Sequence, residues 1–275
     1  MKYSIIEYVW CHKNSFRSKT RVLENFNLVS KVDSKSNLQM IEPPSWEAYS
    51  DGKSIALFPI LTIYCPFRSG GLITLCDTEI DGQKSSRYDA VNVFKKFKNG
   101  AIFSFEQEYY LEDGEDKYVK PNISEIHASY CLRSGIRISE FYFNNDTNKW
   151  IYKISPYNNH WASDFFIFSK FILFKICNDH GIRVNFTDPE LKCIISLSTK
   201  EMREEGGYDH ILKAIDKIAE SYDEKLDWSV GDETAMINIS RHTYESKCGY
   251  FEDRRNKGYV DPYVTTSSLL SIVSG

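Results

Sequence analysis

Residues 101–111 read Ala-Ile-Phe-Ser-Phe-Glu-Gln-Glu-Tyr-Tyr-Leu, and this segment decides how the chain is interpreted. Its aromatic and β-branched residues predict a β-strand. Side chains alternate between the two faces of a strand, so Glu106 and Glu108 project from the same face, roughly 6–7 Å apart. At that spacing each carboxylate has room for its own divalent cation, and the two ions would flank a phosphate. A solvated strand face is the competing interpretation.

A second segment near the C-terminus shows the same alternation. Residues 249–255 read Gly-Tyr-Phe-Glu-Asp-Arg-Arg, which places Tyr250, Glu252 and Arg254 on one strand face. The segment is followed by Asp-Pro-Tyr at residues 261–263. Taken with the Glu-x-Glu strand, it makes a specific pair of motifs.

This pair of motifs resembles the glutamine synthetase family of the eukaryotic type. Further landmarks of that family follow in the same order along nearly the whole chain. They lie at residues 8–10, 16–21, 43–46, 65–68, 72–77, 125–127, 132–135, 198–204 and 232–234. Chance similarity does not explain so many landmarks in one order.

The resemblance implies an α+β fold in two domains. Residues 1–78 would form a small β-grasp-like domain, and residues 79–275 a larger catalytic-type domain with an antiparallel sheet and outer helices. The sequence fits this division, because short strand patterns with turns near Ser34 and Asp51 fill the first part. Helical patterns follow in the second.

Four segments of the second part predict helices. Residues 89–98, 123–134 and 208–222 carry apolar side chains at helical spacing. The apolar run 165–177 is too short to span a bilayer and is interrupted by lysines, so it predicts a buried helix.

Composition excludes several classes of protein. The 275 residues have a charged fraction of 26% and a net charge of −4, which gives no global attraction to nucleic acid or to an anionic membrane. The seven cysteines lie far apart without a CxxC pair, which argues against a zinc site or a disulfide framework. The N-terminus shows no charged-then-apolar leader, and we expect a cytoplasmic protein.

The family makes glutamine from glutamate and ammonia, using ATP and two divalent metals. The resemblance implies a metal site of two glutamates and one histidine near the nucleotide. Glu106 and Glu252 match the two glutamates, but Ile194 stands at the histidine position. An isoleucine has no lone pair with which to bind a metal.

The second metal site of the family needs three glutamates. Glu108 matches one of them, whereas Asn144 and Ile151 stand at the other two. Three of six ligands therefore survive. Because loss of one supporting residue costs about 10–100-fold in metal affinity or activity, the loss of three direct ligands argues against catalysis.

Other parts of the family's site are also altered. Tyr49 replaces an aspartate that helps to bind ammonium, and Asp227 replaces an arginine ahead of the mobile flap. The glycine-rich loop is largely missing between Leu111 and Asn122, and Arg241 is the only arginine in a shortened segment. The catalytic positions that remain are Glu233, which matches the flap glutamate, and Arg254, which matches a substrate-contacting arginine.

Each retained residue also has a structural interpretation. Glu106, Glu108 and Glu252 could form a salt-bridge cluster with Arg254 or Lys200. Glu233 could be a loop acid, and His127, on a predicted helix face, is interpreted as a packed histidine.

Two functions stay open. The first is a shortened glutamine synthetase homologue without catalysis or cofactor, which serves as an interaction or assembly module with its own copies, a homologue or a larger complex. The second is a divergent ATP-dependent carboxylate–amine ligase that works with one metal, for which Mg and ATP would be the cofactors. No membrane partner is expected in either case.

Overall fold

The computed structural model describes residues 3–12, 14–24, 30–32, 39–97, 100–113, 116–117, 121–222 and 226–275. The chain divides into two compact units. One comprises Met1–Tyr88 with Ala128–Ile136, and the other Asp89–His127 with Arg137–Gly275. Within the described ranges, every helix is too short or too polar to cross a lipid bilayer.

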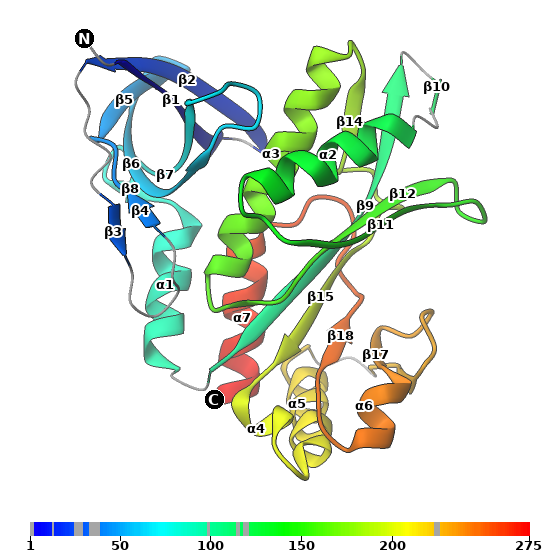
Figure 1. Cartoon of the computed structure of the whole chain (residues 1–275). Coiled ribbons are helices and arrows are strands. Elements are labelled where there is room, and N and C mark those ends of the chain that lie inside the picture. Colours follow the sequence, from blue (N-terminus) through cyan, green and yellow to red (C-terminus); the bar gives the residue numbers. More distant parts are fainter. Residues whose placement is uncertain are drawn as a thin grey trace. The chain divides into compact units, whose positions relative to one another are not determined.

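The first unit is built on a sheet of the order β2-β1-β7-β6-β5, with β8 paired to β7 (Figure 1). Strands β1 and β7 are parallel, and the other neighbours are antiparallel. Its strands are β1 (Tyr3–His12), β2 (Ser15–Glu24), β5 (Trp46–Ser50), β6 (Lys53–Tyr64), β7 (Leu72–Ile80) and β8 (Gln83–Lys84). A separate antiparallel pair consists of β3 (Ser30–Val32) and β4 (Gln39–Ile41).

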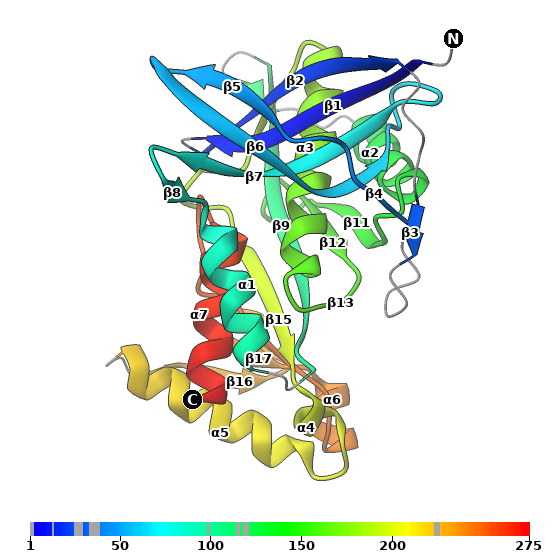
Figure 2. The same cartoon turned by 90° about the vertical axis from the view of Figure 1, so that its left-hand side faces the viewer.

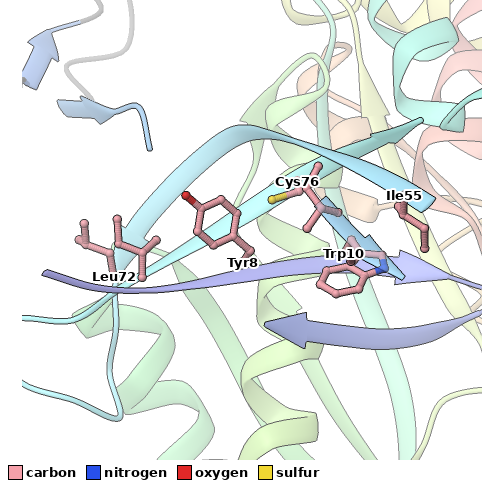
Figure 3. Close-up of a cluster of buried hydrophobic side chains, with 8 residues drawn as sticks. Tyr8, Trp10, Ile55, Leu72 and Cys76 are labelled. Atoms are coloured by element: carbon pink, nitrogen blue, oxygen red, sulfur yellow. The ribbon is translucent and has the colours of Figure 1, made fainter. Parts of the chain in front are cut away.

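Alternation along β1 supplies the core of this unit. Tyr8 and Trp10 lie on its inner face and pack against Ile55, Leu72 and Cys76 (Figure 3). The Tyr8 hydroxyl donates a hydrogen bond of 2.8 Å to a backbone carbonyl, so the buried phenol is satisfied.

The tight turn between β5 and β6 confirms one turn prediction. Asp51 and Gly52 have φ values of 52° and 75°, the left-handed conformation that a two-residue hairpin of this twist requires. The turn predicted near Ser34 lies outside the described residues.

The second unit contains a larger sheet of the order β11-β12-β9-β15-β18-β17-β16. The short strands β10, β13 and β14 pair with β9, and only β16 and β17 run parallel among the described pairs of this sheet. Its strands are β9 (Ile102–Asp113), β10 (Asp116–Lys117), β11 (Ile138–Asn144), β12 (Lys149–Ile154), β13 (Tyr157–Asn158), β14 (Arg183–Asn185), β15 (Cys193–Ser198), β16 (Trp228–Val230), β17 (Ile237–Ile239) and β18 (Phe251–Asp253). The strand predicted at residues 101–111 is β9, and it lies in the interior of the sheet.

The four predicted helices are confirmed, with ends that differ by a few residues. The described helices are α1 (Ser86–Lys96), α2 (Pro121–Arg133), α3 (Trp161–Asp179), α4 (Lys200–Arg203), α5 (Gly207–Tyr222), α6 (Arg241–Ser246) and α7 (Pro262–Ser274). The apolar run 165–177 lies inside α3, most of whose residues are buried.

Helix α3 covers one face of the larger sheet (Figure 2). The rings of Phe105 and Phe166 stack with centroids 4.3 Å apart. Two residues further along β9, the Gln107 Oε1 accepts a hydrogen bond of 3.0 Å from the Lys170 ammonium of α3. Because these β9 side chains face the helix, the alternating residues between them face the other way.

Candidate functional site

The face of β9 turned away from α3 carries the two predicted carboxylates. Strand β12 sets Lys153 beside Glu106 and Ile151 beside Glu108. Strand β15 sets Ile194 on the other side of Glu106. Ile151 and Ile194 are only 3% and 2% exposed. Two positions at which the resemblance implies metal ligands are therefore buried hydrocarbon.

Glu108 is held by two hydrogen-bond donors of this chain. Its Oε2 accepts from the Lys149 ammonium at 2.9 Å and from the backbone N–H of Lys192 at 2.8 Å. Lys149 also donates to the backbone carbonyl of Glu190 at 2.6 Å. The side chains of Glu108 and Lys149 are 12% and 11% exposed, so water screens this ion pair little.

Glu106 faces a second lysine at a longer distance. The Lys153 Nζ lies 3.8 Å from the Glu106 Oε2. Burial raises the pKa of Glu106, although the charges of Lys153 and Arg254 act in the opposite direction. Burial acts to lower the pKa of Lys153, but the attraction of Glu106 and Glu252 outweighs it, and the pKa lies above its ordinary value. Lys153 is therefore charged at neutral pH.

Glu252 and Arg254 form a third ion pair at the end of β18. The Arg254 Nη1 donates to the Glu252 Oε2 at 3.0 Å, and the Asn238 Nδ2 donates to the same oxygen at 3.0 Å. The Arg254 Nη2 lies 3.7 Å from the Glu233 Oε2. Arg254 is 9% exposed and Glu233 is 82% exposed, so the arginine joins a buried acid to one at the surface.

The three retained carboxylates and their cation partners do not fit a pair of magnesium ions. Magnesium needs several oxygen ligands around each ion, but each of the three retained carboxylates already contacts a cation of the chain. Among the described residues, the Arg254 Nε of this cluster is buried without a hydrogen-bond partner, and as an N–H donor it cannot bind a metal. Within the described ranges, no group of three or more acidic, histidine or cysteine side chains is arranged to hold a metal ion.

Two other predicted positions have local roles instead. The Asn144 Oδ1 accepts hydrogen bonds from the backbone N–H groups of Asp146 and Thr147, at 3.0 and 3.2 Å, and so shapes the turn between β11 and β12. Of the two cations considered as partners of the cluster carboxylates, Arg254 pairs with Glu252, whereas Lys200 pairs elsewhere. Its ammonium lies 3.7 Å from Glu204, one turn further along the chain.

The remaining altered positions lie outside β9, β12, β15 and β18. Tyr49 is 74% exposed on β5 of the first unit. Asp227 precedes β16 and Arg241 begins α6, and neither forms an ion pair with another residue in the described part of the chain. The family's glycine-rich loop was predicted to be largely missing between Leu111 and Asn122. Residues 114–115 and 118–120 of that segment lie outside the described ranges.

His127 is a packed histidine, as predicted. It is 1% exposed, and its Nε2 lies 2.9 Å from the Ser169 carbonyl of α3. Burial lowers the pKa of His127 to about 4, so the ring is neutral at physiological pH. All seven cysteines are free thiols.

The sequence interpretation missed the two lysines that neutralise the carboxylates. Lys149 and Lys153 stand two residues before and two residues after Ile151, which had been considered as a ligand position. Alternation along β12 puts all three on one face. That local pattern was the available signal, but it becomes informative only when β12 is known to pair with β9.

A cavity of about 270 Å³ opens on the same side of the sheet. Its polar lining includes Ser104 of β9 and Ser196 of β15, which are direct partners across the two strands. Lys153 and Arg203 also line it, together with Ile102, Pro156 and Tyr250. The cavity lies wholly within the second unit.

Comparisons with known proteins give one consistent answer. No family model matches the chain. Glutamine synthetase of Saccharomyces cerevisiae is 27% identical in an alignment that covers 98% of this chain and 89% of the relative, and that of Eremothecium gossypii is 25% identical with the same coverage. The structure of Plasmodium falciparum glutamine synthetase aligns with a TM-score of 0.71 at 12% identity, covering 98% of this chain and 71% of that chain. The predicted α+β fold and the predicted resemblance to the glutamine synthetases are confirmed.

Proposed function

We propose that this chain, a homologue of the glutamine synthetases, has lost ligase catalysis and serves as an interaction or assembly module. One observation carries the proposal. Each carboxylate retained at a metal-ligand position contacts an ammonium or guanidinium of the same chain. The charge that a divalent cation would neutralise is thus already neutralised by the protein.

The chemistry of the reaction supports this proposal. A ligase that activates a carboxylate with ATP uses divalent cations to neutralise the phosphates and position the transferring group. Here a magnesium ion would have to displace Lys149 from Glu108, and Ile151 beside it offers no replacement oxygen. Ile194 likewise offers no donor beside Glu106.

The catalytic half of the proposal is tested with the purified chain, magnesium, ATP, glutamate and ammonia. We expect no glutamine above background and no magnesium-dependent binding of ATP by isothermal titration. The S. cerevisiae relative, assayed in parallel, controls for the assay. Tight magnesium-dependent ATP binding together with glutamine formation would falsify the proposal.

The assembly half concerns the partner. We propose that the chain associates with its own copies or with a full-length homologue, in the cytosol, where free thiols such as those found here persist. Mass photometry should reveal particles larger than the 32.0 kDa chain, either alone or after mixing with the homologue. Particles of the single-chain mass under both conditions would exclude self-association and association with that homologue.

A divergent ATP-dependent ligase is the second candidate. It is favoured by the contacts of Arg254 with both Glu252 and Glu233, since the two predicted catalytic positions are brought together. Under this alternative, Glu106→Ala abolishes an ATP-consuming activity of the wild type. Absence of any nucleotide-dependent rise in the melting temperature of the wild type excludes it.

A further inference from the structure

Strand β11 leaves an unpaired edge on the larger sheet. It stands last in the strand order of that sheet, so in the described part of the chain no strand pairs with its outer side. Figure 1 shows β11 and β12 as a hairpin whose turn projects from the sheet. An edge strand presents unpaired N–H and C=O groups to which another strand can bind, and proteins usually block such edges with proline, lysine, a bulge or a very short strand.

Strand β11 lacks most of these blocks. Its seven residues, Ile138–Asn144, contain no proline, lysine or arginine. The irregularity in its pairing lies between Ile138 and Glu140, so the residues from Glu140 onward pair regularly with β12. Phe141 and Tyr142 are large side chains that are 40% and 44% exposed. The edge therefore offers regular backbone and exposed aromatic surface to a partner strand.

Two other edge strands are less suited to bind a second copy of the chain. Strand β16 has only three residues, Trp228–Val230, fewer than the five or six of a typical strand. Strand β2 carries Arg17, Lys19 and Arg21 at alternate positions. Pairing with a second β2 about Lys19 would set Arg17 of each copy opposite Arg21 of the other, and like charges directly opposite destabilise a strand pair.

The sequence of β11 is self-complementary about Tyr142. In an antiparallel pair with a two-fold axis at this residue, Phe141 of each copy would lie opposite Phe143 of the other. Glu140 would lie opposite Asn144, so no like charges would face each other. A two-fold dimer requires such self-complementarity, because both copies use the same surface.

This pairing would also extend aromatic packing that is already present in the sheet. Phe143 lies opposite Trp150 of β12, and the centroids of their rings are 5.1 Å apart. The Trp150 ring stacks in turn with Tyr109 of β9, with centroids 6.5 Å apart. Because directly opposite residues share a face, Phe141 of the second copy would lie beside Phe143 and continue this aromatic row onto a fourth strand.

We propose that β11 pairs antiparallel with β11 of a second copy about a two-fold axis at Tyr142. The backbone of the two edges then supplies hydrogen bonds, and the two larger sheets become one continuous sheet. This inference rests on the self-association included in the proposed function and identifies its surface. It does not depend on the loss of catalysis.

Cross-linking of the full chain tests the register. Sedimentation velocity over a range of concentrations should first show a species of twice the 32.0 kDa chain mass. Directly opposite residues have Cβ atoms about 4.5–5.5 Å apart, so a short bismaleimide should link two copies of Tyr142→Cys. Cys11 is exposed, and the variant is therefore made in a Cys11→Ser background, which serves as the blank. Val22→Cys, at a 60% exposed position on the β2 edge, should not exceed that blank.

A charge substitution tests the contribution of the edge to affinity. Tyr142→Lys should weaken the dimer about tenfold, because it replaces an aromatic pair with two like charges directly opposite each other. Val22→Lys is the matched control and should leave the dimer unchanged, and circular dichroism melts verify that both variants fold. A wild type that sediments only as the single chain overturns both this pairing and the self-association. A wild-type dimer that survives Tyr142→Lys, or that Tyr142→Cys fails to cross-link above Val22→Cys, overturns the pairing alone.

Discussion

Replacing Lys149 should lower the free energy of unfolding, because the Glu108 carboxylate would lose the ammonium that neutralises it. At 2.9 Å, the attraction between Lys149 and Glu108 is about 6 kcal/mol for an effective dielectric constant of about 20, before the cost of desolvation is subtracted. Loss of one partner from a fully buried pair costs about 3–5 kcal/mol. Both side chains keep slight exposure, and the Lys192 N–H still donates to Glu108, so we expect Lys149→Met to cost about 2–3 kcal/mol.

A double-mutant cycle separates the ion pair from the rest of the environment. Glu108→Gln keeps the shape of the side chain and an acceptor for the Lys192 N–H, and should cost about 1–2 kcal/mol. Lys149→Met in that background should cost much less than in the wild type, because no unpaired carboxylate remains. We expect a coupling energy of about 1.5–2 kcal/mol.

Urea unfolding followed by circular dichroism, in EDTA and again in magnesium chloride, measures the four free energies of unfolding. Magnesium should partly restore Lys149→Met, because the ion can occupy the space left by the ammonium, but should not affect the Glu108→Gln variant. A coupling energy below about 0.5 kcal/mol, within the usual error of additivity, would refute the reasoning that Lys149 neutralises Glu108.

Three further predictions follow from contacts in the second unit. Adding EDTA or magnesium should leave the melting temperature of the wild type unchanged. Magnesium should instead stabilise a Lys149→Met/Lys153→Met double variant. A lower melting temperature of the wild type in EDTA would contradict the first expectation. Burial holds the pKa of His127 at about 4, so between pH 6.5 and 4 the unfolded chain binds more protons than the folded chain. The free energy of unfolding should therefore fall by up to about 3 kcal/mol as the pH drops through that window. The variant His127→Gln should lack this part of the pH dependence. An unchanged pH profile in that variant would show that the histidine is not held neutral. The Tyr263 hydroxyl donates to the buried Asp164 carboxylate at 2.5 Å, so Tyr263→Phe should destabilise the chain by about 1.5–3 kcal/mol in chemical denaturation, and a loss below about 0.5 kcal/mol would argue against the contact.

Local patterns predicted much of the fold. The helical spacing at residues 208–222 and the apolar run 165–177 each correspond to a helix, because periodicity reports directly on which face is buried. Alternation at residues 101–111 correctly put Glu106 and Glu108 on one strand face. The domain boundary at residue 78 stays a prediction.

The cation partners could not be predicted in the same way. Lys153 meets Glu106 only because β12 and β9 pair in one register, and 47 residues of sequence separate the two side chains at that point. A shift of that register by one residue would turn Lys153 to the helix-covered face. Of the two partners considered from the sequence, Arg254 pairs with Glu252, and Lys200 instead lies near Glu204, four residues further along the chain.

Lys149 and Lys153 of β12 determine which substitutions must be combined if this sheet is redesigned to bind a metal. Installing a histidine at Ile194 or a glutamate at Ile151 alone would add a ligand beside an ammonium that already occupies the neighbouring space. A glutamate installed at Ile151 must therefore be coupled to deletion of a lysine, because either change alone leaves a buried, uncompensated negative charge. We therefore expect paired substitutions, and not single ones, to convert this sheet to a metal site.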